Sequence, residues 1–167
     1  MNHYKSWSGL NKQLTDLLCD PLKGRVTYFL TRYHDVHNAY GRAAILMDKT
    51  ELAVFSWIEM YNQECAASKL YYANGLSYCE AEEKLKPEWD KNCTYCEMDF
   101  LRAATAFLQM SVSDALNCED YIIRIFAILD KRVGKRTLQA IKSEGGYNTL
   151  PGWVKQFYEL RLSVSNC

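Results

Sequence analysis

Two short segments carry side chains that could bind a metal ion. Cys93 and Cys96 form a single C-x₂-C motif, a spacing that lets two thiolates share one ion. His34 and His37 could supply two imidazoles, and Cys79 or Cys118 could contribute instead. A structural zinc site needs four ligands, so the motif is half of the required signature. We therefore keep zinc as a hypothesis for Cys93, Cys96, His34 and His37, and favour ordinary reduced cysteines.

The same residues are the basis for an enzymatic hypothesis. A general base could lie in the polar loop around His34 and His37, where the competing interpretation is a solvated turn. A glutaredoxin-type redox role for Cys93 and Cys96 would require a preceding strand in a βαβ unit, which the sequence does not predict. The chain contains none of the G-x-S-x-G, H-E-x-x-H or H-x-E…P-C-x-x-C patterns. We name no catalytic residue and favour a protein that is not an enzyme.

A basic segment near the C-terminus predicts a second kind of site. Arg124, Lys131, Arg132, Lys135 and Arg136, followed by Lys142, are opposed in their segment only by Asp130. A helix, a glycine turn and a second basic helix could place these cations on nucleic-acid phosphates. The competing interpretation is a solvated or ion-paired face. The run from Gly134 departs from a phosphate-binding P-loop, because it follows a helix and lacks the first glycine and the Ser or Thr after Lys135.

Tyrosines in the least periodic part of the chain support the leading functional hypothesis. Tyr71, Tyr72, Tyr78 and Tyr95 lie in this region, and tyrosine is favoured at interfaces because its ring is apolar and its tip polar. The competing interpretation is partial burial at the edge of a core. With no complete catalytic motif, we expect a non-enzymatic module that binds a protein partner not identified by the sequence. An exposed apolar patch would support this expectation.

Length and composition limit the class of protein. The chain has 167 residues with 20 basic and 20 acidic side chains, so its formal charge is zero. This balance argues against a polyanion-binding tail and against an acidic disordered chain, and the length predicts one domain over residues 1–167. We find no secretory signal and no apolar run near the 20 residues of a spanning helix. With seven cysteines, an odd number, we expect a soluble cytoplasmic protein with reduced thiols.

The first part of the chain, residues 1–57, predicts a helix and a small sheet. Apolar residues recur at helical spacing from Trp7 to Leu18, and Pro21 and Gly24 end that helix. Alternating β-branched and aromatic residues predict strands over 25–32, 42–47 and 52–57, with a hairpin turn of undetermined type around Asp48.

The second part, residues 58–167, predicts a mostly helical half, which makes the fold class α+β. Residues 58–86 are helical in parts with a break near Gly75, and 87–94 reads as a loop. The clearest helix is predicted from Asp120 to Val133, with Asn117 as its N-cap and Gly134 as its C-terminal stop. Helices over 98–109 and 135–142, and one after Pro151, complete the half.

Three segments together resemble a family of short, uncharacterised bacterial proteins. They are Lys5-Ser6-Trp7-Ser8-Gly9-Leu10, the run from Leu18 to Val26, and Leu129-Asp130-Lys131-Arg132-Val133-Gly134-Lys135-Arg136-Thr137-Leu138. The resemblance implies a bacterial cytoplasmic protein of this length. It implies no activity, substrate or site residue.

Overall fold

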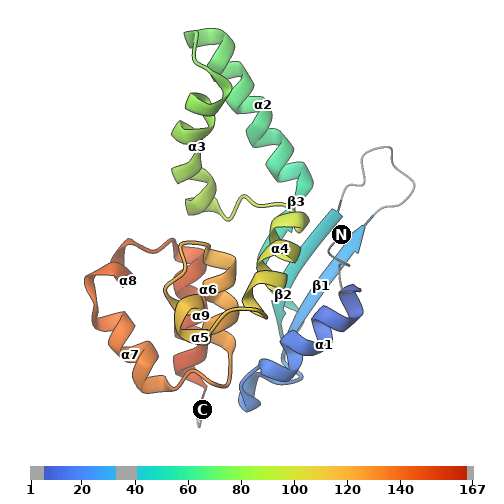
Figure 1. Ribbon diagram of the computed structural model, residues 1–167, viewed down its shortest axis with the longest axis vertical. Coiled ribbons are helices and arrows are strands. Elements are labelled where there is room, and N and C mark those ends of the chain that lie inside the picture. The colour runs from blue at the N-terminus through green and yellow to red at the C-terminus, as the bar shows by residue number, and fades with distance from the viewer. Residues whose placement is uncertain (1–5, 33–40, 165–167) are drawn as a thin grey trace.

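A computed structural model describes residues 6–32 and 41–164 and shows the expected α+β architecture, with helices gathered around one small antiparallel sheet (Figure 1). The strands are β1 (Val26–Arg32), β2 (Gly41–Met47) and β3 (Thr50–Ser56). The helices are α1 (Trp7–Leu17), the 3₁₀ turn η1 (Asp20–Leu22), α2 (Trp57–Asn74), α3 (Tyr78–Asn92), α4 (Glu97–Phe107), α5 (Val112–Leu116), α6 (Tyr121–Leu129), α7 (Lys135–Ser143), α8 (Gly145–Thr149) and α9 (Gly152–Ser163).

The sheet has the strand order β1-β2-β3 and one covered face. Tyr28, Ile45 and Ala53 lie side by side in the register and are all buried. Phe29, the next residue along β1, points to the opposite face and is exposed. This alternation arises because successive side chains of a strand point to opposite faces, so one face meets the core.

The hairpin turn between β2 and β3 is a two-residue turn whose type the sequence left open. Asp48 and Lys49 both have positive φ, of 49° and 70°, as a type I′ turn requires. Arg25 supports the turn, because its side chain donates to the Asp48 carboxylate at 2.7 Å and its carbonyl accepts the Asp48 N–H at 2.9 Å. The tertiary contact thus stabilises a turn that lacks the usual Asn-Gly pair.

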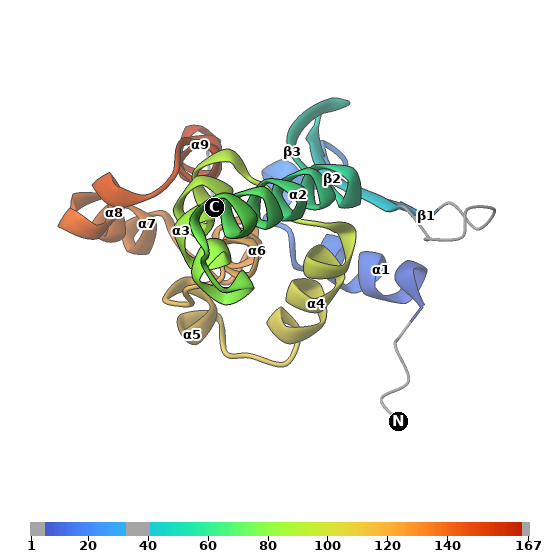
Figure 2. The same cartoon turned by 90° about the horizontal axis from the view of Figure 1, so that it is seen from above.

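Helices α1 and α4 cover the sheet, and α6 forms the centre of the body. Figure 2 shows α1 and α4 together on one side of the sheet, with α7 and α8 at the far end of the body. Seven of the nine residues of α6 are buried. Phe126 of α6 lies edge-on to Tyr28 and Phe100, with ring centroids 5.6 and 5.4 Å apart. The single apolar cluster therefore joins the sheet to the helical half.

The central helix is shorter than its apolar pattern predicts. It starts within one residue of the predicted Asp120, whereas the expected N-cap and C-terminal end were wrong. Asp120, not Asn117, is the N-cap, because its Oδ1 accepts the N–H groups of Ile122 and Ile123. The helix ends at Leu129, because the backbone from Asp130 turns to pair with the end of α1. Gly134 does not end α6 but is the N-cap residue of α7.

The loop expected over residues 87–94 was also largely wrong, because α3 continues to Asn92 with Pro87 inside it. Proline removes one backbone hydrogen bond, and the loss is tolerated where the freed carbonyl can reach solvent. The start of α3 is well fixed, since Ser77 and Glu80 form a reciprocal capping box. The capping box stabilises the start of α3, which helps to offset the hydrogen bond lost at Pro87.

Gly41→Ala is expected to destabilise the fold by about 1–3 kcal/mol, as overpacking does. A Cβ on Gly41 would overlap the Cγ and Cδ atoms of Glu97, whose side chain is buried in the first turn of α4. Urea unfolding would measure the cost, with Gly146→Ala as the control, since a Cβ there meets nothing within 4 Å. Equal stability of the two variants would show that Glu97 moves freely and that the contact is soft.

Candidate functional site

Helices α2 and α3 form an antiparallel hairpin that projects from the body as an arm (Figure 1). We use the name arm for residues 57–92. Gly75, with a positive φ of 66°, makes the tight reversal at the tip. Among the described residues, no helix is long and apolar enough to cross a membrane, α2 included.

The arm has almost no interior of its own. Of its side chains, only Ala67 of α2 and Ala81 of α3 are buried. Leu70 and Leu85, each about one turn from the buried alanine of its helix, are half-buried. Two helices that meet through small and half-exposed residues bury little apolar surface. The stability of the arm therefore depends on the contacts at its base and on any surface that covers it.

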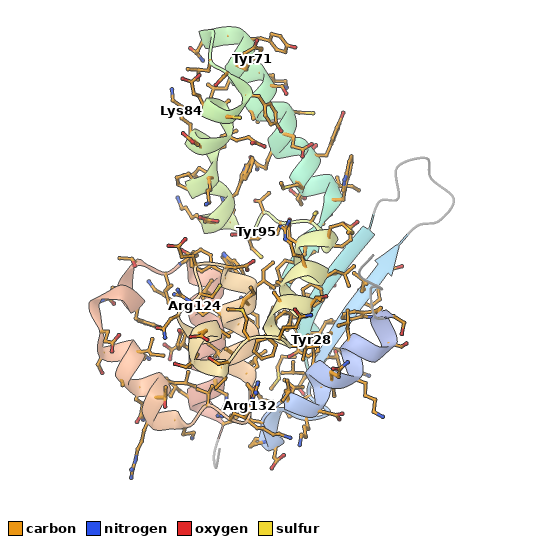
Figure 3. All side chains as sticks on the ribbon, viewed as in Figure 1. Tyr28, Tyr71, Lys84, Tyr95, Arg124 and Arg132 are labelled. Carbon is orange, nitrogen blue, oxygen red and sulfur yellow. The ribbon has the colours of Figure 1, made fainter. Side chains whose placement is uncertain are left out.

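The outer face of α2 is apolar as well. Ile58, Tyr61 and Tyr72 are 56%, 48% and 82% exposed, and lie on the side of the helix turned away from Ala67. Tyr71 and Tyr78 add exposed rings near the tip, where Figure 3 labels Tyr71. A helix that is apolar on two opposite faces is normally covered on both. We call the residues Ile58, Tyr61, Cys65, Ser68 and Tyr72 the outer stripe.

Polar contacts anchor the base of the arm to the body. The Asp90 carbonyl accepts the indole N–H of Trp153 at 2.6 Å, and its carboxylate accepts the Tyr95 hydroxyl at 2.5 Å. The N–H of Ser56 donates to the Tyr95 carbonyl at 2.7 Å. Tyr95 is therefore a structural residue at the root of the arm, half-buried as the simpler interpretation of the tyrosines predicts, whereas Tyr71, Tyr72 and Tyr78 are exposed.

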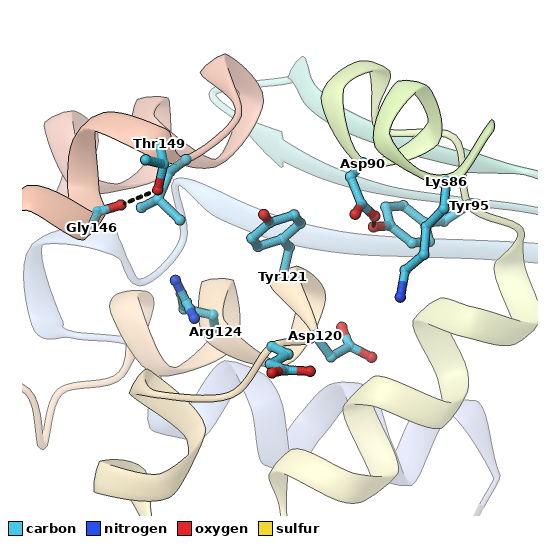
Figure 4. Close-up of a pocket in the computed structure, with 10 residues that line it drawn as sticks. Lys86, Asp90, Tyr95, Asp120, Tyr121, Arg124, Gly146 and Thr149 are labelled. Atoms are coloured by element: carbon cyan, nitrogen blue, oxygen red, sulfur yellow. Dashed lines mark hydrogen bonds between the residues drawn. The ribbon is translucent and has the colours of Figure 1, made fainter. Parts of the chain in front are cut away.

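A cleft of roughly 620 Å³ lies where the arm meets α6 and α8 (Figure 4). It is lined by Lys86, Asp90, Tyr95, Glu119, Asp120, Tyr121, Arg124, Gly146, Thr149 and Leu150. Several of its polar groups already have partners within the protein. Asp120 caps α6, Asp90 holds Tyr95, and the Arg124 side chain donates to the Cys118 carbonyl at 2.6 and 3.0 Å. These three groups therefore have structural roles.

The C-x₂-C pair lies at the junction between arm and body. The Cys93 thiol faces the Val54 carbonyl at 3.7 Å, and burial raises the pKa of Cys93 to about 12. Burial also raises the pKa of Cys96 to about 11. Both thiols are therefore protonated at neutral pH, and neither is activated as a nucleophile. The described part of the chain holds no cluster of three or more His, Cys, Asp or Glu side chains that could bind a metal ion. His34 and His37 lie outside the described residues.

Alkylation is expected to leave Cys93 unmodified in the folded protein at neutral pH. The thiol is largely buried and its raised pKa leaves only a trace of thiolate. Brief iodoacetamide treatment followed by peptide mass spectrometry would measure labelling at each cysteine, with the exposed Cys79 as the internal reference. Labelling of Cys93 as fast as that of Cys79 would show that the Cys93 thiol is accessible and ionised, contrary to this prediction.

Most of the basic residues expected to contact nucleic acid have partners within the protein. Arg124 binds the Cys118 carbonyl, the Lys131 ammonium donates to the Asp16 carbonyl at 2.9 Å, and Lys142 pairs with Glu159 at 2.6 Å. Arg132 holds the buried Asp130 carboxylate through two nitrogens (Figure 3). Lys135 and Arg136 form no ion pair with the described residues, and nucleic-acid contact stays a prediction for this segment.

The outer stripe is the feature that the sequence analysis missed. Its signal is present, because the residues recur at alternating intervals of three and four. A second stripe, Met60, Gln63, Ala67 and Leu70, has the same spacing on the other side of α2. Because the two stripes lie on opposite sides of α2, neither side stands out as the apolar one. The sequence of this segment therefore shows no amphipathic pattern.

The fold and the surface define an α+β protein with a projecting helical arm that carries exposed apolar side chains. The model of the SF0329 protein family matches residues 6–162, so this chain belongs to the SF0329 protein family. No curated protein and no solved structure shows significant similarity to it. The family match agrees with the expected resemblance to an uncharacterised family, while bacterial origin stays an expectation.

Proposed function

We propose that this chain is a non-enzymatic module that binds a protein partner through the arm. The observation that carries the proposal is α2, which is apolar on two opposite faces while α3 covers one of them. Large exposed apolar surfaces on a projecting element mark interaction sites, and tyrosine is among the residues that contribute most to binding.

The charge of the arm favours a protein partner over nucleic acid. Residues 57–92 carry seven acidic and four basic side chains, a net charge of −3. A surface of this sign repels a phosphate backbone, whose recognition depends on clustered cations. Exposed tyrosines within an acidic surround suit a protein surface with an apolar centre and basic residues at its rim.

We also place the module in a reducing compartment, in agreement with the cytoplasmic expectation. The described cysteines form no disulfide, and Cys65 and Cys79 lie on the arm itself. Free thiols on an interaction surface are compatible with a compartment in which glutathione and thioredoxin keep them reduced.

Purification from the native host with arm variants tests the proposal. Ile58→Ser and Tyr72→Ser remove the two most exposed apolar side chains of the outer stripe and leave the body unchanged. Phe29→Ser, which removes an exposed ring from the sheet face, is the matched control. Circular dichroism and thermal unfolding would verify that all three variants fold.

The expected result is a protein recovered with the wild type and with Phe29→Ser, but depleted about tenfold or more with either arm variant, as for a hot-spot residue. Recovery of the same proteins with every variant would show that the arm is not the docking surface. Recovery of neither another protein nor an untagged copy of this chain with the wild type would also contradict the proposal.

A further inference from the structure

We propose that the outer stripe of α2 pairs with the outer stripe of a second copy of this chain, with the two helices parallel and in register. This inference rests on the proposed function, because it names the partner that the arm binds. The second copy would cover the apolar face that α3 leaves exposed.

The spacing of the outer stripe is that of a two-helix seam. The successive intervals between Ile58, Tyr61, Cys65, Ser68 and Tyr72 are three, four, three and four residues. These are the a and d positions of a heptad, which face the partner in a two-stranded coiled coil. The stripe lies on the side of α2 turned away from Ala67, where Ile58, Tyr61 and Tyr72 are exposed, and Cys65 and Ser68 are half-buried.

The charges beside the stripe select the parallel orientation. Glu64 occupies a g position and Lys69 the following e position, one on each flank of the seam. A parallel pair brings Glu64 of each copy to Lys69 of the other, and symmetry repeats this contact. An antiparallel pair centred on Cys65 would instead bring Glu64 against Glu64 of the second copy. Of these two pairings, only the parallel one brings opposite charges together.

The acidic helix of the arm stays outside the pairing. Most of the arm's negative charge lies on α3, which contacts α2 through the opposite face. Two α3 helices would be separated by the α2 pair, roughly two helix diameters or 20 Å. This separation exceeds the Debye length of about 8 Å at physiological salt, so repulsion between them is screened.

The length of the seam predicts a reversible dimer. The 18 residues of α2 extend over about 27 Å, which is short for a helix pair. The contact is therefore smaller than a standard protein interface and predicts association at micromolar rather than nanomolar concentrations.

Charge exchange in the full-length chain is the test, read by sedimentation velocity over a range of concentrations. Glu64→Lys and Lys69→Glu, each alone, replace two attractive contacts by repulsive ones and are expected to weaken the dimer about tenfold. An equimolar mixture of the two variants restores both attractive contacts and is expected to dimerise as the wild type does. Lys155→Glu, a charge change away from the arm, is the control and should dimerise normally.

Oxidation of the wild-type chain with diamide gives an independent readout. Cys65 lies at the centre of the proposed seam and should form a disulfide with Cys65 of the second copy, while diamide takes up the two electrons and two protons. Cys65→Ser should abolish the cross-linked dimer, and Cys79→Ser should not. Cross-linking mainly through Cys79 would contradict the stripe.

Failure of this inference can be distinguished from failure of the proposed function. A wild-type chain that is monomeric at all concentrations, or a mixture of charge variants that does not recover, overturns the self-pairing. Suppose that the chain is monomeric, and that a host protein is recovered with the wild type but not with Ile58→Ser or Tyr72→Ser. The arm then binds another partner, and the proposed function stands. If neither measurement responds to the arm variants, both are overturned.

Discussion

Replacing Leu129 by alanine is expected to lower the free energy of unfolding by about 2–5 kcal/mol, the range for a buried leucine truncated in a packed core. Leu129 is fully buried at the end of α6, within the cluster that joins the sheet to the helical half. Its carbonyl also accepts the N–H of Cys19 at 3.1 Å, so the residue lies where the N-terminal segment meets the central helix. The cavity left by the substitution cannot collapse easily, since both sides are fixed by backbone contacts.

Urea unfolding followed by fluorescence would measure this loss, with Leu76→Ala as the matched control. Leu76 lies at the tip of the arm, half-exposed and outside the core cluster. The same change of side chain there should cost less than about 1 kcal/mol. A cost for Leu129→Ala as small as that for Leu76→Ala would mean that the core of α6 is loosely packed.

Arg132→Ala is expected to cost about 2–4 kcal/mol, because it leaves a buried carboxylate without its counter-charge. The Asp130 carboxylate is completely buried and accepts three hydrogen bonds from the Arg132 side chain, at 3.0, 3.0 and 2.6 Å, and one from the Arg132 N–H at 2.7 Å. Because the Arg132 side chain is 44% exposed, solvent reaches the pair, and we expect a cost below that of a fully buried pair.

Arg136→Ala is the matched control for this variant, since Arg136 is exposed and forms no ion pair with the described residues. It should change stability by less than about 0.5 kcal/mol. Adding Asp130→Asn to Arg132→Ala removes the unpaired charge and should recover part of the loss, which a double-mutant cycle would measure. Full additivity of the two substitutions would show that the pair contributes no coupling.

The side chains of residues 129–132 therefore have structural roles, and these roles bear on the nucleic-acid hypothesis. Lys131 and Arg132 were grouped with Lys135 and Arg136 as phosphate contacts, yet their side chains hold the end of α1 and the Asp130 carboxylate. A loss of stability for Arg132→Ala and none for Arg136→Ala would separate the two pairs. Any contact with phosphates would then be tested on Lys135 and Arg136.

Periodicity alone was enough to predict the elements whose apolar residues face one way. α1 and the three strands lie within about two residues of their predicted bounds, because a single stripe or a clean alternation leaves one choice of buried face. The core of α6 was predicted for the same reason. Its C-terminal end was not, because the pairing of Leu18 with Asp130 joins residues more than a hundred positions apart.

The sequence by itself determined the α+β class, the apolar stripe of α6 and the concentration of tyrosines in the middle of the chain. Only the tertiary structure decided what those residues do. It buried Asp130 and assigned Arg132 to it, placed Tyr95 at the root of the arm, and left Tyr72 82% exposed on the outer face of α2, beside the Tyr71 ring. The physical reason is that periodicity records which faces of an element are apolar, whereas burial depends on which distant element reaches each face. For α2, with two apolar faces, α3 reaches one of them, and the other is the candidate site.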